Sequence, residues 1–237
     1  MTNEGVAAVD RALSILDVFT ESDAGLTLTE ISKRSGLYKS TAMRLAESLE
    51  KFGYLRRDEE GYYRLGAKPL YLGTLYQRQF RTADAVLPVL RQMVGDLCEG
   101  ASFYVRDHRY RICLHRVDAP RAVRDSVCEG DRLPIDVGAS GHVLLAFDGR
   151  SGERYEEIRK KLYAASFGER DPETAAVACP VFGVNHKLAG ALAVSGPRYR
   201  IEATSIEKIL PVLLKHAREL TRVFGGNPDI FGGADTR

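Results

Sequence analysis

The stretch that most constrains the fold of this chain is residues 26–65, which read LTLTEISKRSGLYKSTAMRLAESLEKFGYLRRDEEGYYRL. Thr27 and Glu30 have the spacing of a capping box, which predicts the start of a helix. Gly36 suits the left-handed position that ends this helix, and a second helix follows over residues 39–52. Two strand-like segments around a glycine turn come next and predict a β-hairpin. Together these elements predict a winged helix-turn-helix.

Positive charge is concentrated in one part of this module. Residues 1–66 contain nine Lys/Arg and eleven Asp/Glu, so the module is not basic overall. Residues 33–57 contain seven Lys/Arg and only two Asp/Glu. A winged helix places these segments against DNA phosphates. A basic helix alone is usually a solvated surface, but this charge on tandem helices and a hairpin favours DNA binding.

The predicted DNA contacts lie at the start of the second helix and on the hairpin. The unpaired amides of a helix start favour a phosphate, and Ser40 and Thr41 add hydroxyl groups. Arg44, about one turn later, reaches toward a guanine edge. Arg57 and Arg64 flank the hairpin turn and would straddle the neighbouring backbone. The predicted DNA-binding residues are Lys39, Ser40, Thr41, Arg44, Arg57 and Arg64.

The remainder of the chain has a different pattern. Helical periodicity over residues 70–99, with a break at 82–85, predicts a connector. After Gly100, strand-like and helical segments together predict a mixed α+β domain. The expected strands are 101–106, 109–117, 123–128, 175–182 and 188–195, and the expected helices, with one at the N-terminus, are 6–19, 138–147, 154–163 and 204–224. The Gly- and Asp-rich tail from Gly225 is expected to be frayed.

Composition and hydropathy narrow the class of protein. The 237 residues include 34 Lys+Arg and 32 Asp+Glu, so the total charge neither favours nor excludes nucleic acid. No apolar run reaches the roughly 18–20 residues of a membrane span, and the N-terminus lacks a signal pattern. We expect a cytoplasmic protein with no membrane partner and with reduced thiols. The four cysteines are Cys98, Cys113, Cys128 and Cys179, without C-x-x-C spacing.

Two groups of residues deserve a test as metal or catalytic sites. Cys113 and His115 share a face of an expected strand, but zinc normally takes three or four ligands. Ser140 and His142 are two apart on an expected helix and point to different faces, and Asp136 does not complete a triad. We expect no metal, no cofactor and no catalytic residue.

Several segments resemble the IclR-type transcriptional regulators. The N-terminal domain of that family is similar to VDRALSILDVF, LTLTEISKRSGLYKSTAMRLAESLEKFGYL and YYRLG. Its effector-domain motifs are similar to LPIDVGASGHVLLAF and AAVACPVFGVNHKLAGALAVSGPRYR. The resemblance implies an α+β fold with four parts: a winged helix-turn-helix over 1–67, a linker helix over 68–83, a GAF-like mixed α/β effector domain over 84–225 and a flexible tail over 226–237.

The resemblance also implies a function. It predicts a ligand-responsive DNA-binding regulator of a metabolic, and specifically catabolic, operon. The implied partners are a double-stranded DNA operator, a small organic acid or related metabolite, and further copies of the chain in a homodimer or dimer of dimers. Two alternatives stay open: a cysteine-dependent redox enzyme on a GAF-like scaffold, and an architectural DNA binder that ignores metabolites.

The effector pocket is predicted from the positions that match the family. Gly138, Ala139 and Ser140 open a helix whose amides would cradle a carboxylate. Capping and packing alone are the alternative explanation for these residues. The full predicted set is Gly138, Ala139, Ser140, Ser166, Thr174, Ala176, Ala193, Ser195, Ala122 and Asp125.

The chain departs from the family pattern near this expected pocket. Asp136 stands where the family usually has histidine, and His142 stands where it usually has lysine. Residues 166–170, SFGER, replace an acidic stretch. The usual ligands of the family are therefore not assumed for this chain.

Overall fold

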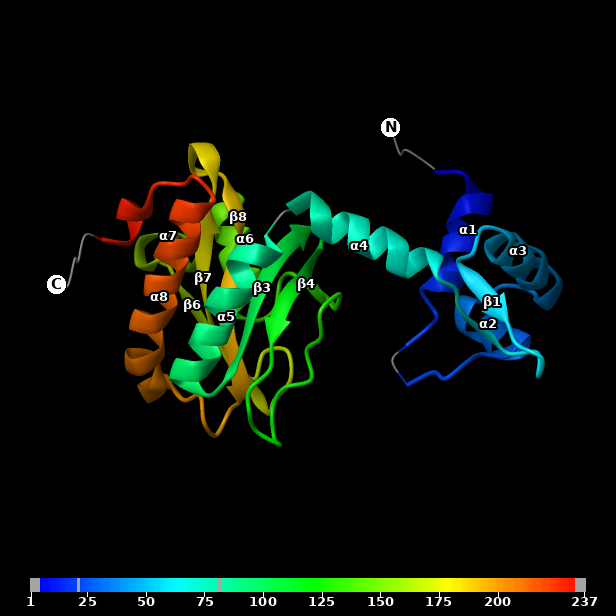
Figure 1. Ribbon diagram of the computed structural model, residues 1–237, viewed down its shortest axis with the longest axis horizontal. Coiled ribbons are helices and arrows are strands. Elements are labelled where there is room, and N and C mark those ends of the chain that lie inside the picture. Colours follow the sequence, from blue (N-terminus) through cyan, green and yellow to red (C-terminus); the bar gives the residue numbers. More distant parts are fainter. Residues whose placement is uncertain (1–4, 21, 81, 233–237) are drawn as a thin grey trace. The chain divides into compact units, whose positions relative to one another are not determined.

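The computed structural model describes residues 5–20, 22–80 and 82–232. The chain divides into two compact units, residues 1–80 and residues 81–237, and each is described by itself. The first unit contains helices and a hairpin, and the second contains a sheet with helices on both faces (Figure 1). This arrangement confirms the predicted α+β class.

The first unit is a winged helix-turn-helix followed by a helix. Its elements are α1 (Ala7–Leu16), α2 (Leu28–Ser35), α3 (Lys39–Lys51), β1 (Leu55–Arg57), β2 (Tyr63–Leu65) and α4 (Lys68–Phe80). The capping box is present: the backbone amide of Thr27 donates to Glu30 Oε2 at 2.8 Å, and the Glu30 amide donates to Thr27 Oγ1 at 3.3 Å. Gly36 ends α2 with φ of 71°. Both local signals are confirmed.

The core of the first unit joins the three helices to the hairpin. Its buried residues are Ile15, Leu26, Ile31, Ala42, Ala46, Leu49, Leu55 and Tyr63. The first helix ends at Leu16, earlier than the predicted residue 19. Val18 and Phe19 lie outside the helix but still pack against this core, so they prolong the apolar pattern that suggested a longer helix.

The second unit is built on a six-stranded antiparallel sheet in the order β5-β4-β3-β8-β7-β6. Its strands are β3 (Gly100–Asp107), β4 (Tyr110–Val117), β5 (Arg132–Pro134), β6 (Ala164–Phe167), β7 (Thr174–Phe182) and β8 (Leu188–Pro197). Its helices are α5 (Ala83–Leu97), α6 (Ala139–Phe147), α7 (Glu153–Lys161) and α8 (Ile206–Val223), with short 3-10 turns η1 (Val184–His186), η2 (Ala203–Ser205) and η3 (Pro228–Phe231).

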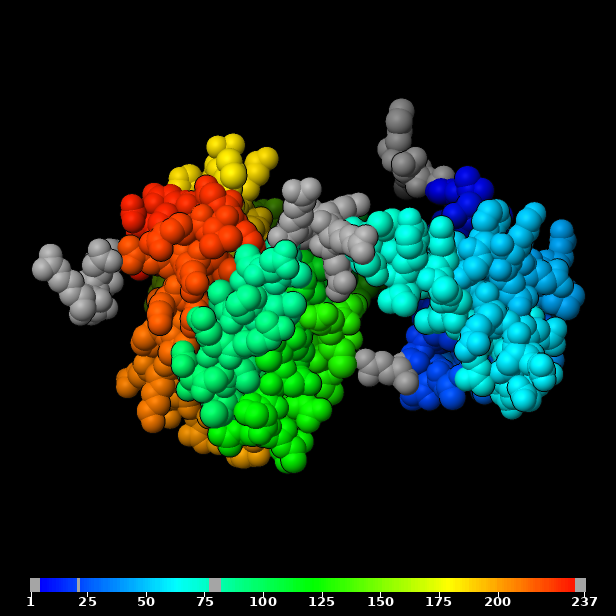
Figure 2. Space-filling model, viewed as in Figure 1, coloured from blue at the N-terminus to red at the C-terminus, as the bar shows by residue number. Residues whose placement is uncertain are grey.

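Each face of the sheet carries its own helical layer. Helices α5 and α8 lie side by side on one face, and Figure 2 shows their side chains forming a continuous surface there. Helix α6 packs on the other face, with α7 against it. The two-residue alternation of strands divides the core accordingly: Phe103 and Val105 contribute to the α5–α8 side, while Tyr104 contributes to the α6 side.

The predicted strands of this unit are wrong in three places. Residues 123–128 form no strand but a loop, in which Asp125 and Val127 are buried. The strands β5 and β6 were not expected, because their three and four residues are too few to show a pattern. Within the predicted tail, Asn227 caps η3, and the ring of Phe231 packs 6.2 Å from that of Phe182. The rest of the predicted tail lies outside the described residues.

Candidate DNA-binding surface and effector pocket

The predicted DNA-contacting residues of α3 lie at its solvent-exposed start. Tyr38 is the N-cap residue of α3, and its side chain makes no capping hydrogen bond. The N-cap side chain therefore does not occupy the backbone amides of the first turn. Lys39, Ser40 and Arg44 are exposed, and Thr41 is half-buried. The opposite side of α3 packs into the core of the unit. This first turn therefore presents hydroxyl, ammonium and guanidinium donors together.

A surface hollow lies beside these residues. Ser40, Thr41 and Arg44 line it, together with Arg11 of α1. Arg11 is not among the predicted residues, because it reaches this hollow through the packing of α1 against α3 and no local signal marks it. The packing of α1 therefore places one more cation, Arg11, beside the predicted DNA-contacting residues of α3.

The two predicted hairpin arginines lie in different environments. Arg57 is exposed, with its guanidinium carbon 5.4 Å from the ring centroid of Tyr63. Arg64 is half-buried: its Nε donates to Asp58 Oδ2 at 2.8 Å, and its Nη1 donates to the carbonyl of Ala24.

Arg56 pairs with Arg64 in the hairpin register, yet it is exposed and has no ion pair among the described residues. Arg56 is not among the predicted DNA contacts, because the sequence pattern does not show which hairpin arginine forms an ion pair within the protein. Arg56 is thus better placed than Arg64 to contact a ligand outside the hairpin.

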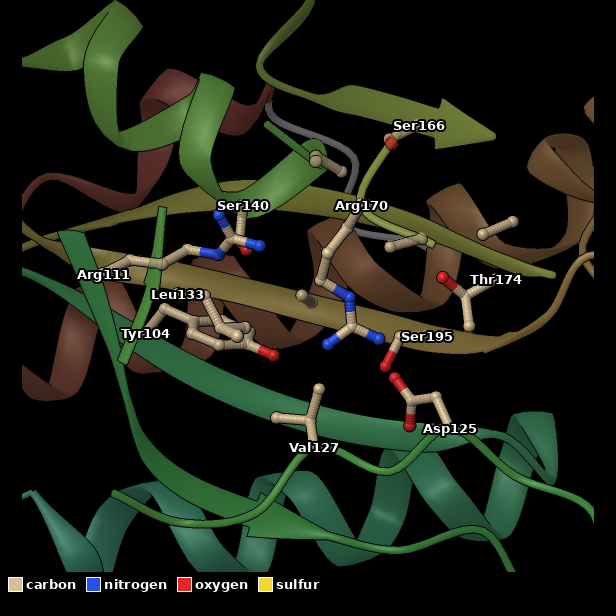
Figure 3. A pocket seen from close by; sticks show the side chains of 15 residues that line it. Tyr104, Arg111, Asp125, Val127, Leu133, Ser140, Ser166, Arg170, Thr174 and Ser195 are labelled. Atoms are coloured by element: carbon tan, nitrogen blue, oxygen red, sulfur yellow. The ribbon is translucent and has the colours of Figure 1, made fainter. Parts of the chain in front are cut away.

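A pocket lies between the sheet and α6 in the second unit (Figure 3). All but one of the predicted effector-binding residues line it, namely Asp125, Gly138, Ala139, Ser140, Ser166, Thr174, Ala176, Ala193 and Ser195. Ala122 does not: it is exposed on the loop that precedes Asp125. Sequence reasoning missed the other lining residues, which are Tyr104, Arg111, Val127, Leu133, Arg170 and Ala175. The cavity itself is small, ≈ 40 Å³.

The start of α6 already holds a carboxylate of the protein. The backbone amide of Gly138, whose φ is 80°, donates to Glu169 Oε2 at 2.9 Å. Arg154 Nη2 donates to Glu169 Oε1 at 2.6 Å, and His142 Nε2 lies 2.6 Å from Glu169 Oε2. Burial raises the pKa of Glu169, but these hydrogen bonds outweigh it and leave the pKa at about 2. The other two backbone amides predicted to bind a carboxylate belong to Ala139 and Ser140. They lie in the first turn of α6, where an amide has no carbonyl acceptor within the helix.

His142 fixes this arrangement rather than lining the pocket. Burial lowers the pKa of its imidazole, although the hydrogen bond to Glu169 opposes the shift. A neutral His142 therefore donates its Nε2–H to the ionised Glu169, and its buried Nδ1 has no partner among the described residues. The unusual histidine and the unusual SFGER stretch of this chain are thus physically coupled.

The buried guanidinium of Arg116 holds Asp125 on the pocket wall. Its side chain is 4% exposed and donates from Nη2 to Asp125 and from Nη1 to Ser102 Oγ at 2.9 Å. Its Nη1 also lies 3.5 Å from Ser195 Oγ, and its Nε donates to Asp118 Oδ1 at 2.8 Å. The negative charge of Asp125 is therefore compensated inside the protein.

Two of the four cysteines lie in the core of the second unit. Cys113 and Cys179 are buried, and burial raises the pKa of Cys113 to about 12 and that of Cys179 well above its ordinary value. His115 Nε2 lies 2.8 Å from Thr82 Oγ1. Within residues 5–20, 22–80 and 82–232, no three His, Cys, Asp or Glu side chains form a group suited to a metal ion. No helix in that part of the chain is long and apolar enough to cross a membrane.

A winged helix-turn-helix followed by a helix and an α+β unit with a pocket is the organisation of a class of DNA-binding transcriptional regulators. Two family models match the chain in order: the IclR helix-turn-helix domain over residues 8–59, and the bacterial transcriptional regulator IclR C-terminal domain over residues 152–222. The chain belongs to the IclR family of DNA-binding transcriptional regulators.

Relatives align with nearly the whole chain. The HTH-type transcriptional regulator KipR of Bacillus subtilis is 25% identical and covers 92% of this chain and 95% of its own. The transcriptional repressor IclR of Escherichia coli is 24% identical, with 93% and 91% covered. These relatives are regulators and not enzymes, so the redox-enzyme alternative is not supported.

Solved structures share the fold. A putative IclR regulator from Silicibacter has a TM-score of 0.77 at 24% identity, covering 96% of this chain and all of its own. An IclR homologue from Microbacterium hydrocarbonoxydans, complexed with 4-hydroxybenzoate, has a TM-score of 0.72 at 22% identity, covering 92% of this chain and all of its own.

Proposed function

We propose that this regulator controls a metabolic, and specifically a catabolic, operon in response to a small organic acid. The observation that carries the proposal is the pocket of the second unit, which is lined by Arg111, Arg170 and the start of α6. Guanidinium groups and helix-start amides are donors that bind carboxylates. The structural relative that holds 4-hydroxybenzoate, itself an organic acid, supports this choice.

We propose that the exposed start of α3 reads operator DNA and that the hairpin contacts the neighbouring backbone. The contact set is Lys39, Ser40, Thr41, Arg44, Arg56 and Arg57, with Arg11 beside it. Arg64 holds the hairpin turn through Asp58 instead of reaching the DNA. This assignment keeps five of the six residues that the sequence predicts.

We propose that the regulator acts as a homodimer or a dimer of dimers. Dimeric winged-helix proteins bind paired half-sites, so the operator is expected to be pseudo-palindromic. Apolar side chains of α1 and α4 are exposed to solvent in the single chain, among them Val9, Leu13, Leu70 and Tyr71. A second copy is the partner expected to cover them, and sedimentation equilibrium measures the resulting mass.

The direct test of the function measures operator binding with and without acids. Fluorescence anisotropy with DNA from upstream of the neighbouring genes gives the Kd, and a panel of small carboxylic acids is added to the complex. An effector shifts this Kd because it binds two conformations of the protein unequally. An operator affinity that no acid changes, with no acid raising the melting temperature, would contradict the proposal.

Arg44→Ala is expected to weaken specific operator binding by about 1–3 kcal/mol, because it removes a guanidinium placed to contact a base edge. Its affinity for unrelated DNA should change much less. Lys51→Ala is the matched control, since it removes one positive charge from the other end of the same helix. Equal losses in the two variants would remove Arg44 from the set of base-reading residues.

A further inference from the structure

The pocket wall carries more positive charge than the protein neutralises. Arg111 and Arg170 both line the pocket, and Arg116 stands behind the wall. Asp125 is the carboxylate among the lining residues, and it is paired with Arg116. Glu169 is already held at the start of α6. Two guanidinium groups thus face the cavity without a carboxylate partner among the described residues.

Arg170 is the first of these groups. It projects from the loop between β6 and β7 into the pocket, between Tyr104 and Ser195 (Figure 3). It is half-buried and has no hydrogen bond or ion pair with any residue of the described ranges. Its neighbour Glu169 is held by α6, so the loop from which the Arg170 side chain extends is anchored beside the pocket. Anchoring of this kind lowers the entropic cost of binding.

Arg111 is the second group, and it is only 3% exposed. Its Nη1 donates to the carbonyls of Pro134 and of Val137, the latter at 2.6 Å, while its buried Nε has no partner in the described part of the chain. Burial lowers the pKa of Arg111, and the positive charge of Arg170 acts in the same direction, while Tyr104, Cys113 and Asp136 oppose the shift without cancelling it. A negative ligand group near Arg111 would relieve both effects.

We propose that the effector is a small dianion, with one acidic group at Arg170 and the other at Arg111 and the start of α6. The inference rests on the proposed function and specifies its ligand class. Dicarboxylates and phosphorylated carboxylic acids share this chemistry, and arginine binds both in a bidentate manner. The cavity of ≈ 40 Å³ favours a short molecule. Arg170 is then the residue that distinguishes a dianion from a monoanion.

The experiment compares matched pairs of acids that differ by one acidic group. The pairs are malonate and propionate, succinate and butyrate, glutarate and valerate, and 2-phosphoglycolate and glycolate. Isothermal titration of the full-length protein gives the Kd of each. Since a hydrogen bond to a charged group is worth more than a tenfold change in Kd, at least one dianion should bind about tenfold or more tightly than its partner. Which pair shows this separates the dicarboxylate from the phosphorylated source.

Variants connect this preference to Arg170. Arg170→Met should abolish the preference and leave the monoanion Kd close to the wild-type value, while Arg170→Lys should keep part of the preference because it keeps the charge. Arg109→Met removes the same charge from the exposed turn between β3 and β4 and should leave the preference unchanged.

Two outcomes would overturn the inference while leaving an organic-acid effector standing: monoanions that bind as tightly as their dianionic partners, or a preference that persists in Arg170→Met. If neither kind of acid binds and none changes the operator affinity, the proposed function itself fails.

Discussion

Asp125→Ala is expected to destabilise the second unit by about 3–5 kcal/mol, because it leaves the buried Arg116 guanidinium without its buried counter-charge. The two side chains are 4% and 3% exposed, so water cannot replace the lost partner. Of the partners that remain, Ser102 and Ser195 are neutral hydroxyl groups, and Asp118 is a carboxylate whose side chain is 51% exposed. Loss of the carboxylate should also release the loop over residues 123–128, which has no strand pairing of its own.

Asp118→Ala is the matched control for this prediction. Asp118 accepts a hydrogen bond from the same guanidinium, but its side chain is 51% exposed. An exposed pair contributes about 0–1 kcal/mol, so this variant should remain close to the wild type. Asp125→Ala and Asp118→Ala therefore each remove a carboxylate partner of Arg116, and the two carboxylates differ in how deeply they are buried.

The measurement must separate the two units of the chain. The chain contains no tryptophan, so urea unfolding is followed by far-UV circular dichroism, and amide hydrogen exchange in β3 and β8 reports on the second unit. Replacing Asp125 and Arg116 together, as D125A with R116M, should recover much of the loss because no unpaired charge remains. An effect of Asp125→Ala no larger than that of Asp118→Ala would refute the buried pair as the cause.

The sequence predicts the first unit well because its signals are local. The Thr27 and Glu30 capping box and the αL glycine at position 36 act within a few residues, and all three lie where expected. The prediction is weaker where partners are distant. Arg64 finds the carbonyl of Ala24, 40 residues away, and no short-range pattern distinguishes it from its exposed neighbour Arg56.

The difference between local signals and distant contacts also separates the predicted from the unpredicted residues of the pocket. Residues such as Gly138 and Ser195 follow from resemblance to a family, and the structure places them around one cavity. The resemblance does not predict the two arginines that make the cavity positively charged. Arg170 belongs to a segment that departs from the family pattern, and Arg111 reaches the start of α6 only through the fold of the sheet.

Segment 123–128 shows why a β-rich composition is not enough to predict a strand. Val123 is exposed there, while Asp125 is buried by its contact with Arg116. This burial is set by one ion pair and not by a ladder of backbone hydrogen bonds. The sheet edge beside β4 is instead taken by β5, at residues that the sequence did not mark as a strand.

Gly141→Ala is expected to destabilise the second unit by about 2–3 kcal/mol and to weaken effector binding, because the new methyl group has no room. A Cβ at this position would lie 2.2 Å from the carbonyl oxygen of Ile135 and 2.9 Å from Arg111 Nη1. The nearest obstacle is backbone, so relief requires movement of the α6 start or of the segment before it. Either movement disturbs Arg111, whose Nη1 holds the carbonyl of Val137.

Gly95→Ala is the matched control, since Gly95 also lies in a helix of the second unit, with nothing within 4 Å of an added Cβ. Alanine in an open helical position is expected to stabilise the protein by about 0.5–1 kcal/mol, because glycine loses more backbone entropy on folding. The two variants therefore make the same chemical change with opposite expected signs. Thermal melting gives the stability of each, and the ligand-induced shift in Tm gives the affinity for the effector. A Gly141→Ala protein that melts like Gly95→Ala and keeps the full ligand-induced shift would show that the α6 start tolerates a side chain, and that its close packing is not what holds Arg111 at the pocket.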